Sequence, residues 1–247
     1  MNLSANVRLL LALPLLVPAA AQTFRSGPER ASLIELYTSE GCSSCPAAEQ
    51  WLARLGRDSR LWQRFVPVVF HVHYWDRLGW RDVFATPEFT RRQQAHAAAW
   101  QVSSVYTPCF VRDGVEWSSR QFDVEPPPAR DAGRLELAWD SAGICQVVFT
   151  PARRTAVAFT ASVALLGGGI VSPVRGGENA GRELRHEFVV LQLQTVPLEK
   201  LDERFCATIR FQADTRHLPA IARHALAGWV TLAGSLKPLQ AAGGWLE

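Results

Sequence analysis

Two cysteines separated by two serines, Cys42 and Cys45, are the residues whose type and spacing most clearly suggest chemistry. They follow an apolar run, 33–38, and precede a segment, 46–55, whose apolar residues recur at helical spacing. This order predicts a dithiol at the turn between a strand and a helix. Such a dithiol can exchange disulfides, bind a metal ion or form a structural crosslink, and these three alternatives stay open.

Disulfide exchange would give each thiol a separate role. The first thiol lies where unpaired N–H groups and the positive end of the helix dipole stabilise a thiolate, so Cys42 is predicted to attack. Cys45 would then resolve the mixed disulfide. A disulfide between residues so near in sequence closes a short loop and stabilises the fold little, which favours exchange over a static crosslink.

The N-terminus has the features of a secretory signal peptide. Arg8 precedes an apolar run, 9–17, and alanines at 19–21 fit the small-residue pattern of a cleavage site. Because the run is shorter than the roughly 20 residues that cross a bilayer, residues 1–21 are expected to be cleaved. No later stretch of the sequence is long and apolar enough to span a membrane. We therefore expect an exported chain, in the periplasm of a bacterium or secreted.

Charge and cysteine content restrict the partners. The formal net charge of +3 falls to +2 once Arg8 is removed, which is too small to indicate nucleic acid or an anionic membrane surface. No cofactor is expected. The glycine-rich segment 176–182 does not match a phosphate-binding loop, because the Lys-Ser/Thr ending is missing. The five cysteines are an odd number, so at least one thiol is free or paired outside the chain. Cys145 and Cys206 could form a structural disulfide.

The first half of the mature chain predicts an α/β layer fold. A second β-rich run, 66–72, precedes an aromatic loop, 73–80. A helix is expected from its N-cap, Thr86, to about Trp100, and a two-residue turn should join strands 109–112 and 115–117.

A proline-rich connector, 125–128, is the candidate boundary between residues 31–124 and a second domain, 131–247. Beyond it the pattern predicts an antiparallel, β-sandwich-like domain with few helices. Its expected strands are 135–139, 146–149, 156–166, 183–194, 206–212 and 225–232.

Several motifs together resemble one protein family. GCSSCP, HVHYWDRLGW, TPEFTRRQ, YTP before VRDG, GGENAGRELRH and PLQAAGGWL occur in this order. With this set, residues 31 to 247 resemble DUF1223, a secreted, thioredoxin-like family of bacteria. The resemblance implies a thioredoxin-like fold with an inserted helical segment and a C-terminal β elaboration, and it implies no established reaction.

The resemblance to thioredoxin-like proteins adds three candidate site residues. In such folds a Thr-Pro pair before the hairpin has a cis peptide bond facing the dithiol, and the backbone before it pairs with an extended substrate. Thr107 and Pro108 occupy this place. A buried acid moves protons for the resolving thiol, so Glu35 is by analogy a candidate proton acceptor. An ion pair of Glu35 with Arg81 or Arg92 is the alternative.

Two histidines support a different function. His73 stands where the family usually has an acid, and together with His71 it is expected to share one face of a strand. With both thiols, these histidines could form a copper or zinc site. A non-enzymatic module that binds metal or a protein is therefore the alternative to exchange.

Three further features have two interpretations each. Cys109 follows the Thr-Pro pair where Gln is usual; it is expected to be buried, although a third thiol beside the dithiol is possible. Aromatic residues could rim a peptide-binding surface or fill the core of the inserted layer. The segment 176–182 is either a hairpin loop or a cover over the dithiol. The residues concerned are Tyr74, Trp75, Trp80 and Trp100 for the aromatic group, and Glu178, Asn179 and Arg182 for the loop.

The sequence thus predicts an exported thiol–disulfide oxidoreductase. Its substrates would be protein thiols or disulfides, and its redox partner is not identified by the sequence. The candidate catalytic residues are Cys42, Cys45, Thr107, Pro108 and Glu35.

Overall fold

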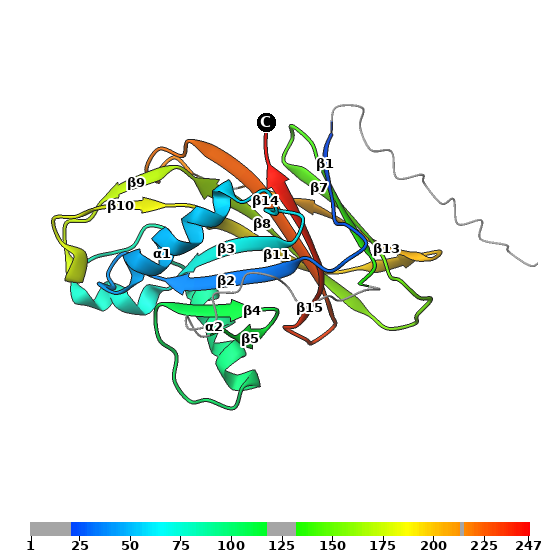
Figure 1. Cartoon of the computed structure of the whole chain (residues 1–247), viewed down its shortest axis with the longest axis horizontal. Coiled ribbons are helices and arrows are strands. Elements are labelled where there is room, and N and C mark those ends of the chain that lie inside the picture. Colours follow the sequence, from blue (N-terminus) through cyan, green and yellow to red (C-terminus); the bar gives the residue numbers. More distant parts are fainter. Residues whose placement is uncertain (1–20, 118–131, 213–214) are drawn as a thin grey trace, which may run out of the picture.

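The computed structural model describes residues 21–117, 132–212 and 215–247 (Figure 1). The predicted signal peptide, apart from Ala21, and the proline-rich connector lie outside the described residues. The fold is mixed α/β, with many strands and few helices. None of the helices in the described ranges has the length and apolar character needed to span a membrane.

The central element is an eight-stranded sheet in the order β15-β14-β8-β11-β3-β2-β4-β5. Strands β2 (Ser32–Thr38) and β3 (Phe65–His71) run parallel and are buried along their whole length, as expected for strands covered on both faces. Strand β4 (Cys109–Arg112) is antiparallel to β2 and continues into β5 (Val115–Glu116). The turn residues Asp113 and Gly114 both have positive φ, as a tight hairpin requires.

Strands from the C-terminal half complete the same sheet. Strand β11 (Val189–Pro197) pairs in parallel with β3, and β8 (Phe159–Gly168), β14 (Arg223–Leu232) and β15 (Pro238–Trp245) follow as antiparallel neighbours. Strands on both sides of the predicted connector therefore share one sheet. The expected strand 183–194 is interrupted, because its first part separates as β10 (Glu183–His186), which pairs with β9 (Ile170–Pro173).

A second sheet of five strands has the order β1-β6-β7-β13-β12. Its buried side chains form a core with side chains of β8, β14 and β15, so the two sheets face each other. The strands are β1 (Gln22–Arg25), β6 (Arg134–Trp139), β7 (Ile144–Thr150), β12 (Glu199–Leu201) and β13 (Arg204–Arg210).

Two α-helices cover opposite faces of β2. Helix α1 (Cys45–Arg54) lies on the face of Thr38, which bonds Glu49 of the helix, and α2 (Pro87–Ala99) lies on the face of Glu35. Thr86 caps α2 as predicted, accepting a hydrogen bond from the Phe89 N–H at 3.2 Å. Short 3-10 helices are η1 (Leu55–Arg57), η2 (His73–Leu78) and η4 (Gly177–Asn179).

Glu35 forms a buried ion pair on the α2 face. Its carboxylate accepts hydrogen bonds from Arg92 at 2.7 and 3.0 Å and from the Tyr37 hydroxyl at 2.8 Å, and His96 lies 3.3 Å away. Burial opposes ionisation, but the charge of Arg92 outweighs it, with help from His96, and holds the pKa of Glu35 well below its usual value. The acid therefore stays charged and depends on Arg92.

Replacing Arg92 with methionine should destabilise the protein by about 3–5 kcal/mol, because Glu35 would remain buried without its cation. Methionine keeps much of the apolar stem that packs on Phe70 and Trp229. Urea unfolding of Arg92→Met is the measurement. The matched control is Arg91→Met, since Arg91 is exposed on the same helix. Equal midpoints for the two variants would contradict a structural role for this pair.

Candidate functional site

The two cysteines lie where β2 leads into α1. Cys42 is in the connecting turn, and Cys45 is the first residue of the helix, with its N–H donating to the Cys42 carbonyl at 3.2 Å. Ser43 and Ser44 between them are exposed, whereas Cys42 is only 1% exposed and Cys45 is fully buried. All five cysteines are free thiols. The predicted strand–dithiol–helix order is confirmed.

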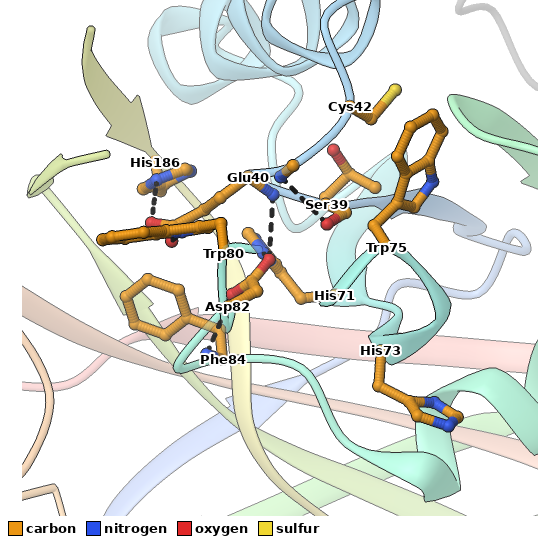
Figure 2. Close-up of polar contacts among 12 residues, drawn as sticks. Ser39, Glu40, Cys42, His71, His73, Trp75, Trp80, Asp82, Phe84 and His186 are labelled. Atoms are coloured by element: carbon orange, nitrogen blue, oxygen red, sulfur yellow. Dashed lines mark hydrogen bonds and ion pairs between the residues drawn. The ribbon is translucent and has the colours of Figure 1, made fainter. Parts of the chain in front are cut away.

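The Cys42 sulfur contacts polar groups of Ser44 and Thr107. Its thiol donates to the Thr107 carbonyl at 3.8 Å, and the Ser44 hydroxyl lies 3.3 Å away. Trp75 lies beside this turn (Figure 2). Its indole N–H donates to the Thr107 hydroxyl at 2.8 Å. The Thr107–Pro108 peptide bond is cis. The structure therefore brings Cys42, Cys45, Thr107 and Pro108 together.

The two thiols differ strongly in acidity. The pKa of Cys42 is lowered to about 6, mainly by its hydrogen bond with the Cys45 thiol; burial opposes this, and contacts with Ser44 and Thr107 contribute. The pKa of Cys45 is raised far above its usual value by burial and by the neighbouring Cys42. Near neutral pH this arrangement holds a nucleophilic thiolate at Cys42 and a protonated thiol at Cys45.

Glu35 does not join the thiols. Successive residues of β2 point to opposite faces, and Glu35 faces α2, whereas Thr38 faces the dithiol helix. Its contact with Arg92 is one of the two ion pairs considered from the sequence. Glu35 and Thr38 are three residues apart, so their side chains point to opposite faces of the strand. This spacing was the signal in the sequence that could have placed Glu35 on the face opposite the dithiol helix.

The segment 176–182 connects β9 to β10 and also folds back onto the dithiol turn, so both interpretations of it hold. Asn179 is buried and donates from Nδ2 to the carbonyls of Glu40 and Cys42, each at 2.8 Å. Glu178 accepts hydrogen bonds from the Ser43 N–H at 2.9 Å and hydroxyl at 2.7 Å, which lower the pKa of its carboxyl. Arg182 donates to the Asn179 side-chain oxygen at 2.5 Å.

The prediction that His71 and His73 share a face is wrong. Strand β3 ends at His71 and η2 begins at His73, so the alternation stops between them. His73 turns to α2, where its Nδ1 lies 2.7 Å from the Thr90 hydroxyl, whereas His71 points into the interior (Figure 2). These two histidines cannot act on the dithiol together.

The other cysteines are separate from this site. Cys109 is buried in the main core, as predicted, and burial raises the pKa of its thiol to about 11. Cys145 and Cys206 lie on paired strands, but Cys145 is opposite Ile209 and Cys206 is opposite Val148. This offset of three residues is roughly 10 Å along the strand, too far for the structural disulfide considered from the sequence.

The aromatic residues belong largely to the core. Tyr74, Trp75 and Trp100 are partly buried against the main hydrophobic core, which favours the second of the two interpretations of this group. Trp80 donates its indole N–H to Glu40 at 2.7 Å. Of the two tryptophans labelled in Figure 2, Trp75 lies nearer to the Cys42 side chain than Trp80 does.

A buried ionic cluster beneath the turn was missed by sequence reasoning. His186 Nδ1 lies 2.6 Å from Glu49, and His71 Nδ1 lies 2.7 Å from Asp82, which also accepts the Glu40 N–H at 2.9 Å. Burial opposes protonation, but Glu49 and Glu40 raise the pKa of His186 to about 10, and Asp82 raises that of His71. Glu49 lies four residues after Cys45 on the buried face of α1. An acidic residue at a buried helix position was the signal in the sequence that could have indicated this cluster.

Comparison with known families and structures gives the family and the fold. The model of the family described as "Protein of unknown function (DUF1223)" matches residues 33–230. The chain belongs to the DUF1223 family. The crystal structure of an Agrobacterium tumefaciens protein is similar with a TM-score of 0.59 at 19% identity, covering 89% of this chain and 96% of that one. The structure of HBP35 of Porphyromonas gingivalis is similar with a TM-score of 0.63 at 16% identity, and the match covers 90% of this chain and 76% of that one. No curated protein matches.

Alkylation of Cys42 should report its lowered pKa. Because the thiolate is the reactive form, the rate with iodoacetamide is expected to rise as the pH passes through about 6 and then to level off. In Cys45→Ala the midpoint should move upward, since the main stabilising hydrogen bond is lost. Mass spectrometry of the modified peptide follows the reaction. A midpoint near that of an ordinary thiol in both proteins would refute this acidity.

Removing the Asn179 amide should destabilise the dithiol turn. Asn179→Ala removes the two side-chain hydrogen bonds to the Glu40 and Cys42 carbonyls, which is expected to lower the free energy of unfolding in urea by about 1–3 kcal/mol. Gln50→Ala, at an exposed position of α1, serves as the control and should change stability by less than about 0.5 kcal/mol. If both variants unfold alike, the loop does not hold the turn.

Proposed function

We propose that this chain is an exported, thioredoxin-like protein that catalyses thiol–disulfide exchange on protein substrates. The supporting observation is the pair of unequal thiols, with Cys42 acidic and Cys45 protonated, beside the Thr107 carbonyl. A parallel β2–α1–β3 unit followed by α2, the Thr107–Pro108 pair and the β4–β5 hairpin supports the thioredoxin-like part. Residues 1–21 of the sequence support export.

Exchange would begin at the Cys42 thiolate. It attacks one sulfur of a substrate disulfide, and the other substrate sulfur leaves as a thiolate that takes up a proton. Cys45 then loses its proton and attacks the Cys42 sulfur of the mixed disulfide, which releases the second substrate thiolate. Two electrons have passed to the substrate, and the protein holds a Cys42–Cys45 disulfide. A dithiol partner would reduce it again, and the reverse sequence would oxidise a substrate dithiol.

Access to Cys42 requires a substrate that approaches along the backbone before Pro108. The sulfur is enclosed by its own turn and by Thr107, with Trp75 bonded to the Thr107 side chain. On the other side, Glu178 and Asn179 hold the turn. The Cys42 thiolate can no longer donate to the Thr107 carbonyl, so an extended peptide would donate a backbone N–H to this carbonyl instead. Tyr106, the residue before Thr107, has an exposed side chain.

The alternative function, a copper or zinc module that uses both thiols with His71 and His73, has less support. His73 contacts Thr90 on α2 and lies outside the cluster that contains His71. Two thiols with a single histidine would remain. Exchange is therefore the function that the geometry supports best.

Insulin reduction tests the proposal. Wild-type protein should accelerate the reaction with a thiol reductant, whereas Cys42→Ser should leave the uncatalysed rate. Cys45→Ser should accumulate a mixed disulfide, because the resolving thiol is missing. Cys206→Ser is the matched control, since that thiol lies on the second sheet, and it should retain the wild-type rate. A wild-type rate equal to that of Cys42→Ser would refute the enzymatic function.

A further inference from the structure

Five ionisable side chains meet in the interior below the dithiol turn. Glu49 comes from α1, His71 from the end of β3, His186 from β10, and Glu40 and Asp82 from the connections after β2 and η2. Each is at most 6% exposed. Burying so many charges is costly unless they stabilise one another or hold a further charged group.

Each imidazole places one nitrogen against an outer carboxylate. His71 Nδ1 lies 2.7 Å from Asp82, and His186 Nε2 lies 3.3 Å from Glu40. The Glu49 carboxylate is oriented in the same way, because its Oε1 accepts from the Thr38 hydroxyl at 2.7 Å. Metal-binding histidines in proteins are typically held by such outer partners, which fix the ring and increase its basicity.

The remaining atoms of these three side chains face one another. Within the described residues, His71 Nε2 is buried and has no hydrogen bond. The contact between His186 Nε2 and Glu40 is close but does not have the geometry of a hydrogen bond. Glu49, His71 and His186 each offer a ligand atom, all within 4.8 Å of one another. Buried nitrogens of this kind nearly always have a partner, so the unbonded His71 Nε2 indicates a ligand between the three.

We infer that Glu49, His71 and His186 bind a divalent first-row transition ion. Two imidazole nitrogens and a carboxylate oxygen are the donor set of zinc, which lies about 2.0–2.2 Å from such ligands. His71 binds through Nε2, since Nδ1 is occupied by Asp82. His186 binds through Nδ1, and the proton now shared with Glu49 at 2.6 Å leaves as the ion enters.

The surroundings of the cluster suit a structural ion. The Phe84 ring packs edge-on against both imidazoles, with centroids 5.2 and 5.6 Å away, and the imidazole centroids are 5.3 Å apart. An ion here would join α1, β3 and β10, and therefore tie the dithiol helix to the strand pair that carries Asn179. The ligands of this site include neither of the predicted catalytic thiols and not His73.

The test uses a variant in which both cysteines of the dithiol are replaced, so that this pair cannot bind the metal. Cys42→Ser/Cys45→Ser protein is stripped with a chelator and titrated with Co²⁺ and then Zn²⁺. We expect one equivalent of Co²⁺ with a spectrum of nitrogen and oxygen ligation, displaced by Zn²⁺. Adding His71→Gln should weaken binding by roughly 100-fold or more, and Asp82→Asn by about 10–100-fold. His73→Gln is the control and should bind normally.

A second measurement keeps the inference testable if the ligand variants fail to fold. With the cluster intact, Zn²⁺ in excess should raise the thermal unfolding midpoint of the Cys42→Ser/Cys45→Ser protein, because the ion binds only the folded state. Substoichiometric binding without this rise would overturn the inference, and so would equal losses in His71→Gln and His73→Gln. Because the variant lacks both proposed catalytic thiols, the result is independent of the proposed function.

Discussion

The alternation of side chains along β2 determines the arrangement on which the rest of the structure depends. The strand is buried on both faces, and each face carries a polar residue that must find partners. On one face Glu35 pairs with Arg92 of α2, and on the other Thr38 bonds Glu49 of α1. Each helix is thus attached to the sheet by a polar contact as well as by apolar packing. The dithiol extends from the end of this strand.

Local sequence patterns predicted the elements near the dithiol well. The apolar run before Cys42, the Thr86 cap and the Asp113–Gly114 turn each carry a strong short-range signal. Pairing between distant segments has no such signal. The parallel contact of β11 with β3 joins residues that are far apart in sequence, so it could not be derived from periodicity. The prediction for His73 was wrong because the alternation of side chains along β3 was assumed to continue to His73, although the strand ends at His71.

The C-terminal half contributes directly to the candidate site. Strand β11 gives β3 its neighbour in the sheet, and the β9–β10 pair supplies Asn179 and His186. Asn179 donates to the Glu40 and Cys42 carbonyls of the dithiol turn, and His186 neutralises Glu49 under α1. The polar character of 176–182 indicated a loop, but its partners depend on where β10 lies, which only the assembled sheet determines.

The acidity of Cys42 comes from neutral neighbours. Its largest lowering contribution is the hydrogen bond with the Cys45 thiol, followed among the lowering contacts by Ser44 and Thr107, and no cation is among the main causes. The thiolate therefore depends on Cys45 keeping its proton, which the burial of Cys45 ensures. A stabilised thiolate exists only in the reduced protein, so it favours the dithiol over the disulfide. In the exchange reaction that we propose, this preference would favour oxidation or isomerisation of the substrate.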